Sequence, residues 1–272
     1  MATLVCFHAH PDDECITTGG VIAKYSAAGH RVVIVSATGG EHGEVPDDLA
    51  DGETIVDRRR RELECAAAQL GAARVAWLGY ADSGMTGWQQ NSAPGAFAKA
   101  DLEEAARRLA DVLEEEGADT LTVYDWHGNY GHPDHVKVHH VGHRAAELAA
   151  TPNVYEATTN RDQFQRMLQM AEAMGLDTDD IDPDEMTDDG NPMGTPEAEL
   201  TTAIDVSAFV GHKRRALQCH KSQVTDTTML LEMPEEAFAA MMGTEWFVNK
   251  GADPGIAESE LAGMDQDVKR NT

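Results

Sequence analysis

The sequence predicts an α/β fold, in which a Rossmann-like, mostly parallel sheet carries helices on both faces and a small C-terminal appendage. Two observations lead to this prediction. Short apolar runs rich in β-branched residues alternate with longer segments of helical periodicity. Glycines stand where helices should end, as at Gly71 and Gly117. Strand and helix units that alternate at this length form parallel sheets, because each helical crossover brings the chain back to the same sheet.

The elements are expected in a regular order, and each has its own local pattern. Strands are predicted where apolar residues run together, and helices where they recur every three to four residues. In chain order the first half has a strand at residues 3–8, a helix at 17–28, a strand at 31–37, a helix at 56–70, a strand at 75–78, a helix at 102–116, a strand at 120–124, a helix at 136–149 and a strand near 153–158. The second half has a strand at 203–206 and helices at 210–219 and 234–242.

Three regions are predicted along the chain. Residues 1–160 form the Rossmann-like, metal-binding catalytic core. Residues 161–250 form the appendage, which completes the substrate pocket and contains an acidic, Pro-containing loop at 177–189. Residues 251–272 are expected to be a flexible tail.

The composition excludes several classes of partner. The chain has 272 residues, of which 48 are acidic and 21 basic, so its formal charge is -27. Such a charge repels phosphate backbones and anionic membranes, so neither nucleic acid nor a membrane is an expected partner. The four cysteines have no CxxC spacing and are expected to be reduced. With no targeting or membrane-spanning segment in the pattern, the expected location is cytoplasmic.

Two histidine-containing turns follow predicted strands. His10-Pro11-Asp12-Asp13-Glu14 comes after the strand at 3–8, and Gly131-His132-Pro133-Asp134-His135 comes after the strand at 120–124. The first turn alone could be an ordinary bend in which Asp12 or Asp13 caps the next helix. Two such turns in the same context are hard to explain by capping, so together they indicate a functional site.

The expected topology explains how the two turns could meet. If their strands are neighbours where the strand order reverses, both turns face one crevice. His10, Asp13 and His135 could then form three metal ligands that leave positions open for water. This set suits Zn²⁺, and it also suits Fe²⁺. Asp12 would remain free to deprotonate the water, so the residues predict a metal-dependent hydrolase.

The two motifs together resemble the PIG-L/LmbE family of zinc-dependent N-acetylglucosaminyl deacetylases, from the N-terminus to about residue 158. The likeness is closest to its mycothiol-pathway group, the GlcNAc-inositol deacetylases and the mycothiol S-conjugate amidases. The resemblance implies an enzyme that removes the N-acetyl group from a GlcNAc-containing small molecule such as GlcNAc-inositol. It also implies that His10, Asp13 and His135 bind zinc, with Asp12 as the general base.

The resemblance assigns further residues. His132 matches a histidine that stabilises the oxyanion or protonates the leaving amine, and Tyr130 matches a tyrosine that helps to polarise the amide carbonyl. Asp134 is expected to orient His132 through a hydrogen bond. The remaining matches concern substrate binding. Arg59 and Asp82 match residues that bind sugar hydroxyls, and Glu41 lies in a Gly-Glu loop near the site.

Alternative functions stay open at this point. The sequence departs from the motifs of this mycothiol-pathway group at residues 15–18 and 125–129. The departure at 125–129 leaves room for a deacetylase of a secondary-metabolite amino sugar. A mycothiol S-conjugate amidase is a further alternative, although the lysine that such an amidase usually carries shortly after the first motif is missing at 15–18. From other classes, a non-haem iron oxygenase and a non-catalytic sugar-binding relative share the ligand set. A homo-oligomer is also open. His220 is expected to be a satisfied surface or core histidine.

Overall fold

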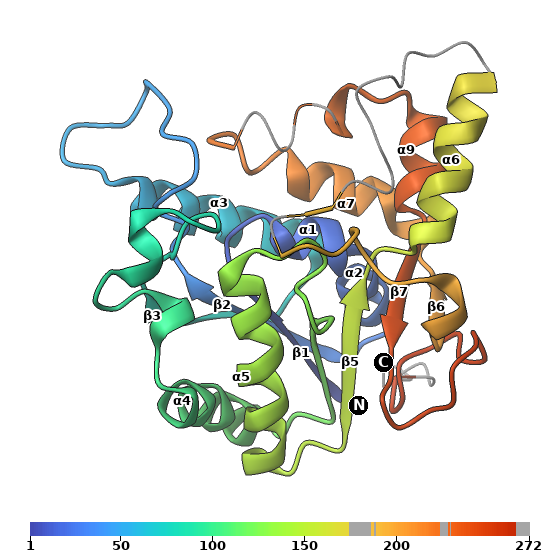
Figure 1. Cartoon of the computed structure of the whole chain (residues 1–272), viewed down its shortest axis with the longest axis horizontal. Helices are drawn as coiled ribbons and strands as arrows, with labels where there is room; N and C mark the ends of the chain where they lie inside the picture. Colours follow the sequence, from blue (N-terminus) through green and yellow to red (C-terminus); the bar gives the residue numbers. More distant parts are fainter. Residues whose placement is uncertain (174–185, 188, 224–227, 229, 265–272) are drawn as a thin grey trace, which may run out of the picture.

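A seven-stranded sheet in the order β3-β2-β1-β4-β5-β7-β6 forms the centre of the protein (Figure 1). The computed structural model describes residues 1–173, 186–187, 189–223, 228 and 230–264. The strands are β1 (Thr3–His8), β2 (Arg31–Thr38), β3 (Arg74–Tyr80), β4 (Thr120–Tyr124), β5 (Asn153–Thr158), β6 (Thr202–Asp205) and β7 (Thr244–Val248). Strands β1 to β5 pair in parallel, whereas β7 runs antiparallel to β5 and β6. The predicted α/β fold with a mostly parallel sheet is therefore confirmed.

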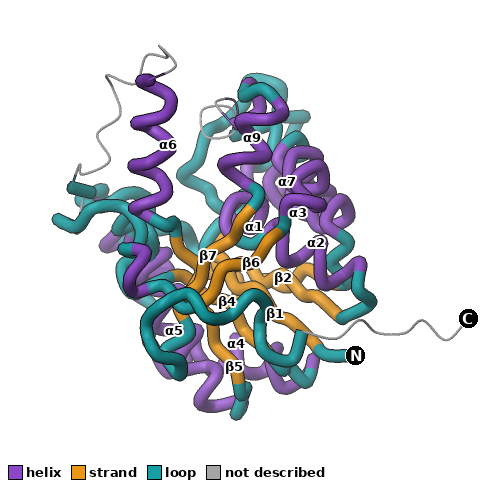
Figure 2. The backbone as a smooth tube through the Cα atoms, turned by 90° about the vertical axis from the view of Figure 1, so that its right-hand side faces the viewer, coloured by secondary structure: helices purple, strands orange, loops and turns teal. Residues whose placement is uncertain are grey.

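Helices cover both faces of the sheet. They are α1 (Asp13–Thr17), α2 (Gly19–Ala27), α3 (Ile55–Leu70), α4 (Leu102–Glu116), α5 (Pro133–Ala149), α6 (Arg161–Ala173), α7 (Val210–Leu217) and α9 (Glu235–Met242). Short 3₁₀ helices are η1 (Gln89–Ser92), η2 (Phe97–Lys99), η3 (Glu197–Glu199) and η4 (Ser207–Phe209). Figure 2 shows α4 and α5 on one side of the sheet and α2, α3 and α7 on the other. None of the helices in the described ranges has the length and apolar character required to cross a membrane.

The alternation of side chains along β1 divides the core into two layers. Leu4 and Cys6 pack with the helices α2, α3 and α7, whereas Val5 and Phe7 pack with α4 and α5. Successive side chains of a strand point to opposite faces, and all four are fully buried. This is why the run at the start of the chain is continuously apolar, as is typical of a central parallel strand.

The capping residues explain where the long helices begin and end. The Thr54 side chain accepts a hydrogen bond from the Asp57 N–H and the Asp57 carboxylate accepts one in return, which starts α3. Gly71 ends α3 and Gly117 ends α4, both in the left-handed conformation. The two glycines act as predicted.

Several elements differ from the sequence expectation. The helix expected at 17–28 is two helices, α1 and α2, which meet at Thr18. Helix α6 and strand β7 were not predicted. Strands β6 and β7 extend the main sheet, so residues 161–250 are not a separate layer. The tail expected from residue 251 packs against the body as far as Met264: Leu261 is fully buried, and its N–H donates to the Tyr25 hydroxyl. Most of the acidic loop at 177–189 lies outside the described residues.

The expectation that all four cysteines are reduced is wrong for one pair. Cys65 in α3 and Cys219, just after α7, form a disulfide with a Cα–Cα distance of 5.8 Å. The two residues are 154 positions apart, so no local spacing signals the pair. They meet because α3 and α7 pack side by side on one face of the sheet. Cys6 and Cys15 are free and buried.

A buried ion pair fastens the C-terminal part to the first helices. Lys213 Nζ lies 2.6 Å from Glu245 Oε1, and both side chains are almost completely buried. The other donors to the Glu245 carboxylate are the backbone N–H groups of Gly20 and Val21, at 2.7 and 2.8 Å, in the first turn of α2. A carboxylate at a helix N-terminus also interacts favourably with the helix dipole. Glu245 therefore joins β7, α7 and α2.

We expect the substitution Glu245→Ala to lower the free energy of unfolding by about 3–5 kcal/mol, because it leaves the buried Lys213 charge without a partner. Urea denaturation of the variant measures the change. The exposed Glu199 provides a control, since Glu199→Ala should change the stability by less than about 0.5 kcal/mol. Equal, small effects of both substitutions would contradict this role of the pair.

Candidate active site

The two His-Pro-Asp turns lie in one pocket at the carboxyl ends of the central strands. Strand β1 has β2 on one side and β4 on the other, so the strand order reverses between β1 and β4. Ligands of open α/β sheets bind at this position. The pocket has a volume of about 710 Å³. We call it the active-site pocket; its walls are formed by His10, Asp12, Asp13, Ile16, Thr17, His42, Gly43, Glu44, Arg59, Asp82, Gly84, Met85, Trp88, Asn129, Tyr130, His132, His135 and Gln223.

The three predicted metal ligands lie together. Asp13 stands between two imidazoles, with its Oδ2 3.5 Å from His10 Nδ1 and its Oδ1 3.4 Å from His135 Nε2. His135 Nδ1 is 3.3 Å from the Gly128 carbonyl oxygen, so this nitrogen carries the ring proton and donates it. The other nitrogen, Nε2, is buried and makes no hydrogen bond within the described residues. An unprotonated ring nitrogen beside a carboxylate fits a divalent metal ion.

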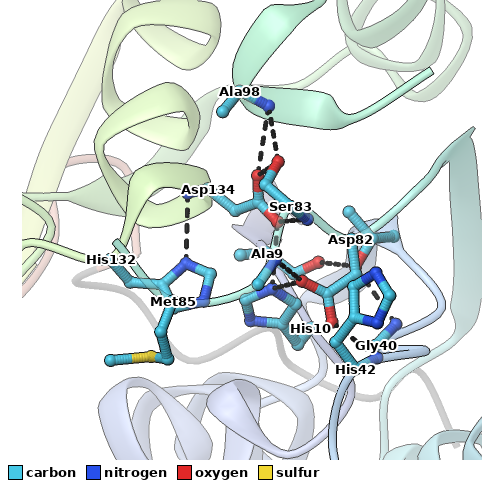
Figure 3. Close-up of polar contacts among 12 residues, drawn as sticks. Ala9, His10, Gly40, His42, Asp82, Ser83, Met85, Ala98, His132 and Asp134 are labelled. Carbon is cyan, nitrogen blue, oxygen red and sulfur yellow. Dashed lines mark hydrogen bonds and ion pairs between the residues drawn. The ribbon is translucent and has the colours of Figure 1, made fainter. Parts of the chain in front are cut away.

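The orientation of His10 depends on Asp134. His10 Nε2 lies 3.2 Å from Asp134 Oδ2, which places a proton on Nε2 (Figure 3). The other ring nitrogen, Nδ1, is directed at Asp13. The Asp134 carboxylate is fully buried and also accepts from the N–H and hydroxyl of Ser83 and from the Ala98 N–H. Carboxylates that hold a ligating histidine in this way fix its tautomer.

The Asp134 carboxylate does not take part in the expected hydrogen bond with His132. Instead, the backbone N–H of Asp134 donates to His132 Nδ1 at 3.1 Å, while the carboxylate faces His10. His132 is the N-cap residue of α5, which explains why a backbone N–H two residues later is available to it.

His132 is a neutral imidazole with a defined tautomer. The pKa of His132 is lowered to about 2, mainly because the ring is buried. The neighbouring His10 and His135 rings lower it further. Because its Nδ1 accepts the Asp134 N–H, the ring proton lies on Nε2. Tyr130 lines the same pocket, with its ring centroid 6.2 Å from that of His132. The arrangement supplies an N–H donor to a ligand in the pocket.

Asp12 is buried next to the metal-ligand set. Its Oδ2 lies 3.0 Å from the guanidinium of Arg59. Burial raises the pKa of Asp12 to about 7, although the Arg59 charge opposes this effect. A carboxylate that titrates near neutrality is suited to act as a general base.

The predicted substrate-binding residues fall in different places. Arg59 lines the active-site pocket, but its guanidinium also donates to the carbonyl oxygens of Gly40 and Pro11 and to Asp12. Asp82 lines the pocket too, while its carboxylate accepts the N–H groups of Gly84 and His42. Asp82 therefore stabilises the backbone of two loops and also faces the pocket. Glu41 is not among the pocket residues, although His42 and Glu44 of the same loop are.

Two buried residues behind the pocket were not predicted as site residues. Glu14 Oε1 lies 2.7 Å from His220 Nε2, and both residues are fully buried. Glu14 Oε2 accepts the N–H of Asp12 at 2.9 Å. Glu14 belongs to the first motif, whereas the His220 segment shows no local signal for this contact. His220 is a core histidine, as expected, but it is only partly satisfied, because its buried Nδ1 makes no hydrogen bond within the described residues. Its partner Glu14 holds the loop of Asp12.

A second group of potential ligands lies outside the active-site pocket. His139, His143 and Glu156 could together hold an ion. However, Glu156 Oε1 already contacts His143 Nε2 at 2.7 Å and Lys250 Nζ at 2.8 Å. The Glu156 carboxylate is therefore already paired with the positive charge of Lys250.

Sequence comparisons identify relatives over most of the chain. The model of the PIG-L family, described as GlcNAc-PI de-N-acetylase, matches residues 5–146. A 1D-myo-inositol 2-acetamido-2-deoxy-alpha-D-glucopyranoside deacetylase from Thermomonospora curvata is 39% identical over 287 positions, covering 94% of this chain and 94% of that protein. A protein of the same name from Thermobispora bispora is 37% identical over 270 positions, covering 91% and 88%.

A solved structure shares the fold. The N,N'-diacetylchitobiose deacetylase from Pyrococcus horikoshii superimposes with a TM-score of 0.56 over 91% of this chain and 83% of that chain, at 21% sequence identity. At this identity the likeness concerns the fold alone.

We expect His135→Gln to weaken the binding of Zn²⁺ more than about 100-fold, because the loss of a direct ligand should exceed the effect of losing an outer-shell partner. Titration calorimetry with ZnCl₂ on chelator-treated protein measures this. His140→Gln is the matched control, since His140 is exposed on the same helix and should leave the affinity unchanged. Undiminished binding by the His135 variant would place the ion elsewhere.

Proposed function

The chain belongs to the PIG-L family, and from this premise we propose that it is a zinc-dependent deacetylase that removes the N-acetyl group from a GlcNAc-containing small molecule. The observation that supports this most directly is the bare, buried Nε2 of His135, which faces Asp13 beside the buried carboxylate of Asp12. The names of the relatives make GlcNAc-inositol the first substrate to test.

The metal and the base would have separate tasks. In the proposal His10, Asp13 and His135 hold the ion, and the chemistry that Zn²⁺ supplies when bound is polarisation of the acetyl carbonyl and of the attacking water. Asp12 accepts the proton from this water. Arg59 holds the Asp12 carboxylate in place through its contact at 3.0 Å. Asp134 keeps His10 turned toward Asp13.

His132 and Tyr130 would act on the other side of the acetyl group. The neutral His132 presents its Nε2–H to the oxygen that becomes negatively charged in the tetrahedral intermediate. Collapse of the intermediate requires a proton on the leaving nitrogen, and the proton that Asp12 has accepted is suited to this step. The products are acetate and the free amino sugar. Tyr130, which also lines the pocket, would donate a second hydrogen bond to the carbonyl oxygen.

The alternative functions that share this ligand set are not equally well supported. An iron oxygenase has no support from a parallel sheet or from deacetylase relatives. A non-catalytic sugar-binding protein would not need a buried carboxylate with a pKa near neutrality. A mycothiol S-conjugate amidase or a deacetylase of another amino sugar would use the same residues, so the choice among these concerns the substrate and not the reaction.

Asp12→Asn should reduce kcat for release of the amine from GlcNAc-inositol by about 10²–10⁴-fold, because the amide cannot accept the proton. The assay quantifies the free amine with zinc-loaded protein. The zinc content of the variant should equal that of the wild type, because Asp12 is not one of the three ligands. A variant that keeps both its zinc and full activity would contradict the role of Asp12 as base.

Arg59→Gln should move the acidic limb of the kcat/KM profile to higher pH. Arg59 lowers the pKa of Asp12, and the base must be ionised, so loss of the positive charge requires a higher pH for the same activity. Arg59→Lys keeps the charge and should stay closer to the wild type. A raised KM with an unmoved limb would instead support the predicted grip of Arg59 on sugar hydroxyls.

A further inference from the structure

A second cavity adjoins the active-site pocket. It has a volume of about 230 Å³. Ile16, Thr17 and Asn129 line both the cavity and the active-site pocket, so the two spaces adjoin at these side chains. A group attached to a sugar in the active-site pocket could therefore extend past them.

Large apolar side chains from three separate elements line this cavity. Phe164 and Met167 belong to α6, Met241 belongs to α9, and Trp246 belongs to β7. The remaining uncharged lining residues are the apolar Leu230, Met193 and Met242 and the polar Thr158, Thr159, Asn160, Gln163 and Thr244. We call the space the apolar cavity. Methionine side chains adapt to irregular apolar ligands, because a thioether is flexible and polarisable.

The charged residues of the apolar cavity are already paired. Lys213 and Glu245 line it, but they bind each other at 2.6 Å and bind backbone groups of α1 and α2. They offer no free charge to a ligand. The polar residues Thr17 and Asn129 lie at the boundary with the active-site pocket. Thr159 also lies near this boundary, because its N–H donates to the Asn129 side chain. An apolar ligand would therefore contact the apolar side chains of α6, α9 and β7.

We propose that the apolar cavity binds the aglycone of the substrate, and that this aglycone carries an alkyl or aromatic group. The inference rests on the proposed deacetylase function. An apolar cavity of about 150 Å³ can already hold a benzene molecule, so the space here is large enough for a ring or a short chain. GlcNAc-inositol presents hydroxyl groups to such walls and gains little from them. Ile16, which is 37% exposed, would be covered by the bound group.

The first test compares 2-acetamido-2-deoxyglucopyranosides that carry methyl, butyl, hexyl and octyl aglycones, below their micelle concentrations. Each methylene buried in the cavity should raise kcat/KM about two- to fourfold until the cavity is filled, mainly through a lower KM. GlcNAc-inositol serves as the polar reference substrate. Turnover of the methyl glycoside without any gain from longer chains would overturn the proposal and leave the deacetylase function intact.

A pair of variants on one helix locates the effect. Met167 lines the apolar cavity, whereas Met170, one turn further along α6, is 66% exposed and does not. Met167→Glu should lower the octyl-to-methyl ratio of kcat/KM at least tenfold, because it places a charge in the apolar wall. Met170→Glu should leave the activity on every glycoside unchanged. Equal losses in both variants would show that the preference arises outside the cavity.

A binding measurement separates the two proposals if no glycoside is hydrolysed. Octyl 2-acetamido-2-deoxyglucopyranoside is titrated into zinc-loaded wild-type protein and into the Met167→Glu variant by calorimetry. Tighter binding of the octyl than of the methyl glycoside, lost in the variant, would support the apolar cavity even though the deacetylase function had failed. Equal binding of both glycosides by the wild type would overturn the proposal.

Discussion

The position of Asp12 depends on one buried carboxylate, that of Glu14. Asp12 has a φ of 111°, a conformation that a non-glycine residue rarely adopts and that costs about 1–3 kcal/mol. Glu14 offsets this cost because its Oε2 accepts the Asp12 N–H. Its Oε1 is in turn held by His220 at 2.7 Å and by the thiol of Cys15 at 2.9 Å. The conformation that directs Asp12 into the pocket therefore depends on a contact between the first turn of the chain and residue 220.

The segment around His220 supports the site at more than one point. Ser222 donates to the Glu62 carboxylate through both its N–H and its hydroxyl. Gln223 exchanges hydrogen bonds with the backbone of Glu44, in the loop that lines the active-site pocket. The disulfide of Cys219 ties the start of this segment to α3. Residues far from the two His-Pro-Asp turns in sequence thus fix both Asp12 and one wall of the pocket.

The sequence predicts the elements and ligands that depend on local order, and misses those that depend on distant contacts. The strands β1 to β5 follow from apolar runs, and the topology that joins His10 to His135 follows from their alternation with helices. Strand β7 escapes prediction because its sequence, Thr244–Val248, is short and its β character comes from pairing with β5 and β6. The choice of His10 over His132 as the partner of the Asp134 carboxylate depends on side-chain direction, which spacing does not reveal.

The pocket residues come from two parts of the chain, and this explains why the reaction is better defined than its substrate. The proposed ligands and base, together with His132, lie within residues 5–146, the part that the PIG-L family model matches. The apolar walls beyond the sugar come from residues 164–246, outside that match. A family match over the first half therefore reports the hydrolysis of an N-acetyl group. In our proposal the group attached to the sugar is selected by α6, α9 and β7, which contain none of the proposed metal ligands.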